Sequence, residues 1–262
     1  MKLALREEMT PGESLADKLS WLETMGFAGI ELSGSSLDLP VDEIRAAFAD
    51  SSVQAANVGG ASTLIDPDAD VRALAMDTMR ERLALSAALG ARGVLLVPQF
   101  GRRPKLPDLE PLMTAEEEER ELFRLQLRAL AAEAQAAGTR IYLEPLNRYE
   151  AYMVNRLEQG LGFATPLAPE VGIMADFFHM NIEEADIAAS IRGAGEHLFH
   201  VHVADSNRLQ PGRGHIDFKH GFAALKEIGY DGYFGFECRV DGDFDESLRT
   251  SMQYLREQWD AA

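Results

Sequence analysis

Eight short apolar runs alternate with longer stretches of helical periodicity along the whole sequence. The runs are LALRE near residue 3, AGIELS near 28, VQAANVG near 53, GVLLVPQ near 93, IYLEPL near 141, GIMADF near 172, FHVHVAD near 199 and YFGFECR near 233. Runs of this length indicate buried strands, and apolar residues recurring every three or four positions indicate helices between them. Eight strand–helix units in 262 residues predict a (β/α)8 TIM barrel forming a single domain over residues 1–262. An open doubly wound sheet is the alternative architecture.

The helical stretches carry recognisable ends. Thr114 followed by Glu117 predicts a capping box that opens the fourth helix, and Gly138 predicts its end. In the last helix, Leu248 and Leu255 belong to one apolar stripe that faces the core. We find no repeat, no glycine-rich phosphate loop and no linker that would divide the chain.

Charge and cysteine content exclude several classes of protein. The formal net charge of −18 argues against a nucleic-acid partner, since such proteins neutralise phosphates with basic surfaces. The single cysteine, Cys238, excludes an internal disulfide framework, and we read it as a packing residue. No apolar run reaches the ~18 residues of a membrane span, and the acidic N-terminal segment is unlike a secretory signal. We therefore expect a cytoplasmic protein without a membrane partner.

Four ionisable residues stand at the same place in consecutive strand–helix units. They follow or end the fifth to eighth apolar runs: Glu144, Asp176, His202 and Glu237. In a barrel, catalytic groups lie at the carboxyl ends of the strands, so these side chains are expected to converge. Because side chains alternate along a strand, a second inward layer is expected two residues earlier, made of Tyr142, Met174, His200 and Gly235.

Three carboxylates and one imidazole at one point would repel each other unless a cation lies between them. An oxygen-rich set with one nitrogen suits Mn²⁺, Mg²⁺ or Co²⁺ better than structural zinc, which prefers cysteine and histidine. We predict one divalent metal ion, Mn²⁺ ahead of Mg²⁺ and Co²⁺, and no organic cofactor.

Four segments resemble the xylose-isomerase-like barrel superfamily and are most similar to ketose 3-epimerases of the D-tagatose 3-epimerase type. These segments are LEPLNRYE, DFFHMNIEE, HVHVADSNRLQPGRGHIDF and GYFGFE, which together span residues 143–237. The resemblance implies the same four metal ligands that the strand-end positions suggest. It further implies that Glu150, His179 and Arg208 contact a small-molecule sugar.

The implied reaction is the inversion of C3 in a ketohexose or ketopentose. A proton beside the ketone leaves one face and another returns to the opposite face, through a metal-stabilised enediolate. Glu144 and Glu237 would exchange the roles of base and acid.

Other functions remain open. An aldose–ketose or hydroxypyruvate isomerase would use the same paired glutamates, and a keto-sugar or inosose lyase-dehydratase would start from the same enediolate. A barrel that binds sugar without turnover is the non-enzymatic alternative. Such barrels commonly form homo-oligomers, and a dimer or tetramer is expected here, with aromatic residues such as Phe222 and Tyr254 as candidate contacts.

The loop after the fourth strand departs from the ketose epimerase pattern. It carries Arg102, Arg103 and Lys105 where those enzymes place tryptophan against the sugar. These cations, with Arg213, could bind a phosphate or carboxylate on the substrate, or they could be solvated.

Overall fold

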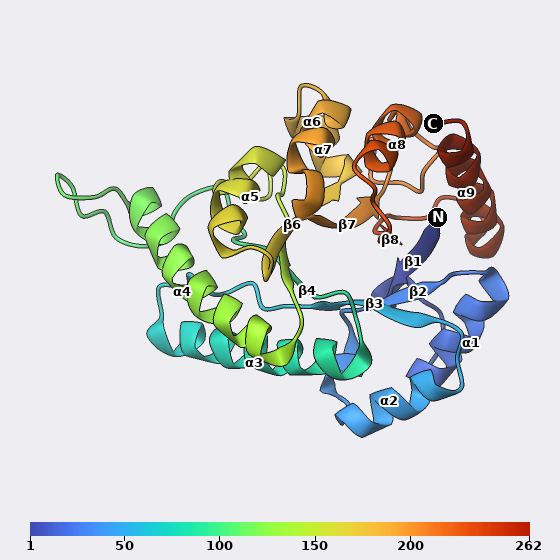
Figure 1. The fold of residues 1–262 in the computed structure, drawn as a ribbon, viewed down its shortest axis with the longest axis horizontal. Coiled ribbons are helices and arrows are strands. Elements are labelled where there is room, and N and C mark those ends of the chain that lie inside the picture. The colour runs from blue at the N-terminus through green and yellow to red at the C-terminus, as the bar shows by residue number, and fades with distance from the viewer.

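The computed structural model describes all 262 residues as one closed eight-stranded parallel barrel surrounded by helices (Figure 1). The strands are β1 Lys2–Arg6, β2 Gly29–Leu32, β3 Gln54–Gly59, β4 Val94–Leu96, β5 Ile141–Leu143, β6 Val171–Asp176, β7 Leu198–Val203 and β8 Tyr233–Phe236. Each of the eight apolar runs forms one of these strands. Pairing of β1 with β8 closes the barrel, which excludes the open doubly wound sheet.

Nine α-helices follow the strands. They are α1 Leu15–Met25, α2 Val41–Ala49, α3 Ala69–Leu89, α4 Ala115–Ala137, α5 Leu157–Ala164, α6 Phe177–Glu183, α7 Ile187–Ala194, α8 Phe218–Glu227 and α9 Phe244–Asp260. Short 3-10 turns stand at Glu7–Met9, Ser35–Asp38, Thr165–Leu167 and Gly195–His197. None of the helices combines the length and apolar composition that a membrane-crossing helix requires.

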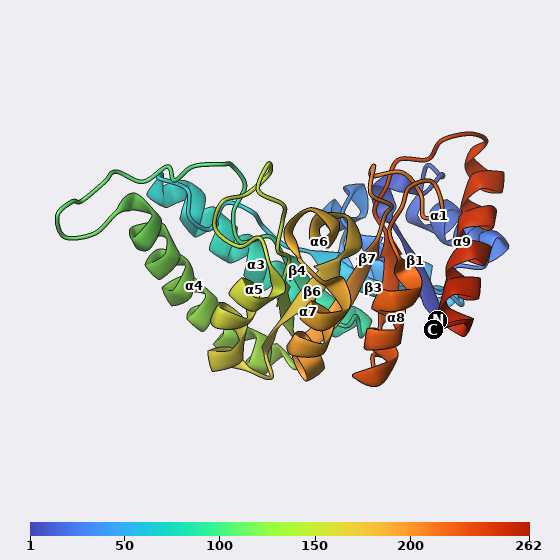
Figure 2. The same cartoon turned by 90° about the horizontal axis from the view of Figure 1, so that it is seen from above.

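Helix α4 begins and ends where the sequence predicts. Thr114 accepts a hydrogen bond from the amide of Glu117, whose carboxylate accepts one from the amide of Thr114, and left-handed Gly138 ends the helix. The loop 97–114 between β4 and α4 extends away from the barrel (Figures 1 and 2). Leu112 on this loop is 89% exposed.

The main core lies between the strands and the helices. Phe222 is fully buried there, in edge-on contact with Phe234 and Trp259. The expectation that Phe222 is a surface contact is therefore wrong: it lies on the inner, apolar face of α8. Tyr254 is partly buried against the same core.

A second layer of buried side chains fills the barrel interior, as the alternation along the strands predicts. The Tyr142 ring stacks on His200 with ring centres 5.5 Å apart, and Met174 packs in the same cluster as Tyr142. Gly235 pairs in register with His202 on the neighbouring strand. This layer supports the site above it.

Candidate metal centre and active site

The carboxyl ends of β5 to β8 bring Glu144, Asp176, His202 and Glu237 together. One ligand atom from each of the four lies within 4.8 Å of the others. Strand register produces this arrangement, because Asp176 pairs directly with His202 and Glu237 follows the end of β8. The side chains of Glu144, Asp176 and His202 are almost wholly buried, while that of Glu237 is 19% exposed. The predicted convergence of these four residues is confirmed.

Nδ1 of the His202 ring faces the three carboxylates. It lies 2.9 Å from Oε2 of Glu237, 3.4 Å from Oε1 of Glu144 and 3.7 Å from Oδ2 of Asp176. Neither this nitrogen nor Oε1 of Glu144 has a hydrogen-bond partner, although both atoms are buried. Buried polar atoms without partners are rare and call for an explanation. Their number, chemistry and separation fit one divalent cation held by three oxygens and one nitrogen.

Arg208 joins two members of this cluster. Its guanidinium lies 2.6 Å from Oδ2 of Asp176 and 2.5 Å from Oε2 of Glu237, and it stacks over the Phe178 ring at 4.7 Å. Although Asp176 is buried, the charge of Arg208 holds the pKa of its carboxyl well below the usual range. Arg208 has a φ of 59°, a left-handed conformation that is uncommon outside glycine and often found at functional sites.

The loop after β5 holds His179 through Asn147. The backbone amide of Asn147 donates to Nδ1 of His179 at 3.2 Å, and its side-chain nitrogen lies 2.8 Å from the same atom. Since Nδ1 accepts, the neutral ring carries its proton on Nε2, which lies 3.8 Å from Asp176. The side-chain nitrogen of Asn147 also donates to Oε1 of Glu150 at 2.7 Å. One asparagine thus orients two predicted sugar-contacting residues.

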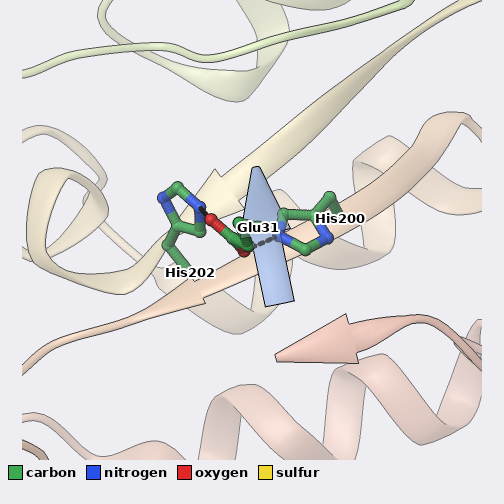
Figure 3. A group of neighbouring side chains, drawn as sticks. All are labelled: Glu31, His200 and His202. Carbon is green, nitrogen blue, oxygen red and sulfur yellow. Dashed lines mark hydrogen bonds and ion pairs between the residues drawn. The ribbon is translucent and has the colours of Figure 1, made fainter. Parts of the chain in front are cut away.

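Glu31 on β2 lies between the imidazoles of His202 and His200 in the barrel interior (Figure 3). Although burial opposes its charge, the imidazoles of His202 and His200 hold the pKa of its carboxyl well below the ordinary value. Burial lowers the pKa of His200. Burial also opposes the charge of His202, but Glu31, Asp176 and Glu144 together outweigh it and raise the pKa of His202 well above its ordinary value. Asn57 lies 3.2 Å from the same His200 nitrogen that faces Glu31.

A cavity of about 280 Å³ opens directly on the cluster. Glu150, His179 and Arg208 line it together with Glu144 and Glu237, so the structure brings all the predicted sugar-contacting residues to one cavity. The cavity continues toward the ends of β2 and β3 and toward α3, where its walls include Ser33, Ser62, Thr78 and Arg82.

The cations singled out in the sequence lie elsewhere. Arg102, Arg103 and Lys105 border a separate hollow on the protruding loop, and Arg213 pairs on the surface with Asp241 at 2.6 Å. The arginines that do line the main cavity include Arg6 and Arg82. Arg102 and Arg103 thus lie away from the main cavity, whereas Lys105 also borders a small hollow that shares Ser62 and Phe100 with it.

Cys238 follows Glu237 and is partly buried. Burial raises the pKa of its thiol to about 12, so at neutral pH it is an unreactive thiol rather than a nucleophile.

Four residues of the site escape sequence reasoning: Glu31, Asn57, Arg6 and Asn147. Arg6, at the end of β1, donates to Glu237 and thereby adds a second guanidinium to that carboxylate. The signal for Glu31 was its charge within an otherwise apolar strand, because a charge is buried only when it is paired.

Comparisons with known proteins agree with this geometry. Residues 19–258 match the model of the family described as xylose isomerase-like TIM barrel. The chain is 31% identical over 264 residues to the 3-dehydro-D-guloside 4-epimerase of Escherichia coli K12, covering 98% of this chain and 99% of that one. It is 32% identical over 201 residues to the L-ribulose 3-epimerase of Mesorhizobium japonicum, covering 76% of this chain and 66% of that one.

Solved structures of sugar epimerases share the fold of this chain. The apo crystal structure of an E. coli 3-keto-D-glucoside 4-epimerase superposes with a TM-score of 0.89 at 29% identity, covering 98% of this chain and 99% of that one. The D-psicose 3-epimerase of Clostridium cellulolyticum H10 with D-tagatose superposes with a TM-score of 0.84 at 25% identity, with 99% of each chain covered. All four relatives are named as sugar epimerases, which are isomerases. The chain described here belongs to the xylose isomerase-like TIM barrel family.

Proposed function

We propose that this protein is a sugar epimerase that requires one divalent metal ion, Mn²⁺ foremost, and inverts the carbon next to a ketone, most readily C3 of a ketose. One observation carries the proposal. The buried cluster of Glu144, Asp176, His202 and Glu237 opens into a cavity that Glu150, His179 and Arg208 also line. One cavity therefore contains a candidate cation site, two candidate proton-transfer groups and polar side chains that can bind sugar hydroxyls.

The paired glutamates would perform the proton chemistry. One carboxylate removes the proton from the carbon beside the ketone, and the other returns a proton to the opposite face. A divalent cation bound by the four residues would stabilise the negative charge that develops on the substrate oxygens. Arg208 keeps Glu237 oriented, and Nε2–H of His179 is available to donate to a substrate oxygen.

Inversion at C4 of a 3-keto-sugar, carried as a glycoside, is a second candidate. Its support is the extension of the cavity past the glutamates to Ser62, Thr78 and Arg82. A free ketose would not need this space, whereas the group attached to C1 of a glycoside would. The relative that is 31% identical over nearly the whole chain is named as a 4-epimerase of such a compound.

A substrate panel tests the proposal. Mg²⁺- or Mn²⁺-loaded protein is incubated with D-fructose, D-tagatose, D-psicose, L-ribulose and a 3-keto-D-glucoside, and the products are resolved by chromatography. An epimer from any of these supports an epimerase and tells C3 from C4. An aldose product would indicate an isomerase, a dehydrated product a lyase, and binding without conversion a sugar-binding barrel.

The cytoplasmic location and the homo-oligomer stay predictions. Light scattering coupled to gel filtration would determine whether the protein is a dimer or tetramer.

A further inference from the structure

Glu31 reaches two imidazoles at once. Its Oε2 lies 3.0 Å from Nε2 of His202, and its Oε1 lies 2.6 Å from Nε2 of His200 (Figure 3). The three side chains are at most 2% exposed. Glu31 stands on β2 and both histidines on β7, so only the closed barrel brings them together.

The contact to Glu31 determines which nitrogen of His202 carries the proton. A carboxylate can only accept a hydrogen bond, so Nε2 of the neutral ring must donate to it. Nδ1 is then left with its lone pair, and Nδ1 is the atom that faces Glu144 and Glu237 without a hydrogen-bond partner. The ring therefore presents a free donor atom to the proposed cation site.

Residues around the Glu31 carboxylate leave space for it and hold its position. Gly235 on β8 has no side chain, and a Cβ added there would lie 1.9 Å from Oε1 of Glu31. Any residue other than glycine at 235 would occupy the space of the carboxylate. Nε2 of His200 contacts this same oxygen, and Tyr142 stacks on the His200 ring in turn.

We propose that Glu31 is a positioning residue of the metal centre, which fixes the orientation and the tautomer of His202 so that Nδ1 can bind the cation. The inference rests on the proposed metal site. The buried side chains inside the barrel, below the four proposed ligands, would then orient a ligand as well as fill space. In known metal sites, losing such a partner weakens metal binding by about 10- to 100-fold.

The test is a titration of the metal-free protein with Mn²⁺, in which the electron paramagnetic resonance signal reports the free ion. Glu31→Gln keeps the shape of the side chain but accepts through only one oxygen. Its Mn²⁺ dissociation constant should rise by about 10- to 100-fold. Glu119→Gln is the matched control, since Glu119 is equally buried but binds Tyr152 and the amide of Leu106, away from the cluster. It should bind Mn²⁺ like the wild type.

The outcomes separate the two proposals. A folded Glu31→Gln protein that binds Mn²⁺ as tightly as the wild type would overturn the role of Glu31 and leave the metal site intact. A wild type that binds no Mn²⁺ would overturn the metal site itself.

A measurement on the wild type covers the case in which Glu31→Gln does not fold. ¹⁵N–¹H correlation spectra of the Mg²⁺-loaded protein should show the proton of His202 on Nε2. A proton on Nδ1 would contradict the inference.

Discussion

Nδ1 of His202, on β7, lies 2.9 Å from Oε2 of Glu237, which directly follows the neighbouring strand β8. The register of β7 and β8 sets His202 opposite Gly235, two residues before Glu237. Arg208 and Arg6 both donate to Glu237, whereas Oε1 of Glu144 has no partner. The two glutamates therefore have different surroundings, and only one is held by arginines.

Binding of a divalent cation should stabilise the fold. A ligand at about 100 times its dissociation constant contributes ~2.7 kcal/mol to the free energy of unfolding. Thermal unfolding of the wild type should therefore shift upward when Mn²⁺ is added, and Asp176→Asn should lose that shift because a charged ligand is gone.

Asp217→Ala is the control for this experiment. Asp217 caps α8 by accepting from the amide of His220, so its loss should lower the free energy of unfolding by about 1 kcal/mol. The Mn²⁺-dependent shift should remain. A full shift in Asp176→Asn would contradict the assigned ligand set.

Arg208→Lys should lower kcat/KM by about tenfold or more, because an ammonium is a point charge and cannot span two carboxylates as the guanidinium does. Steady-state kinetics on the substrate found in the panel provide the measurement. Arg213→Lys alters an exposed pair with Asp241 and should leave kcat/KM unchanged. Equal kinetics in both variants would show that the bridge between Asp176 and Glu237 is dispensable.

Asn147→Asp should impair turnover without weakening metal binding. The aspartate has the same shape but no amide protons, so it cannot donate to Glu150 and it repels that carboxylate. We expect a fall in kcat/KM of about tenfold, with the Mn²⁺ dissociation constant close to that of the wild type. A large loss of Mn²⁺ affinity would instead place Asn147 in support of the metal.

Ser62→Phe distinguishes the two candidate reactions. Ser62 is exposed at the far end of the cavity, so a phenyl ring there should fill the extension without disturbing the core. Turnover of a 3-keto-glycoside should fall, while turnover of a free ketose should be little changed. If the glycoside reacts as fast in the variant, the extension does not hold its C1 substituent.

The stability contributed by Glu7 should depend on pH. Although Glu7 is buried, hydrogen bonds from Lys18 and Ser36 hold the pKa of its carboxyl below the ordinary glutamate value of about 4.5. The depressed pKa means that the unfolded chain takes up the proton first as the pH falls. The contribution of Glu7 is therefore complete above about pH 4.5 and is lost below it, toward the folded-state pKa.

Urea unfolding of the wild type and Glu7→Gln at several pH values measures this contribution. The difference in the free energy of unfolding should be constant near neutrality and shrink on acidification below about pH 4.5. A difference that grows on acidification would contradict the assigned direction of the pKa shift.

The sequence reveals the barrel and the four clustered ionisable residues because both depend on local pattern. A strand end can be read from the run that precedes it, so Glu144, Asp176, His202 and Glu237 can be placed without a structure. Glu31 could not be placed, since its partners are contributed by β7 across the closed barrel.

In loops, the position of a residue after a strand does not predict whether it lies in the site. Glu144 directly follows β5, whereas Arg102 and Arg103 lie six and seven residues beyond the end of β4, on a loop that takes them away from the site. Asn147 was within a recognised motif, but its role appears only when α6 brings His179 beside it.

Solvent deuterium uptake is the most direct test of proton transfer by Glu144 and Glu237. The substrate that turns over is incubated in D₂O with Mg²⁺-loaded wild type, Glu144→Gln and Glu237→Gln, and proton NMR follows each carbon of the sugar. Wild-type product should carry deuterium at the inverted carbon beside the ketone. Neither variant should form epimer. An epimer without deuterium, or a Glu144→Gln protein with wild-type turnover, would contradict proton transfer by the paired glutamates.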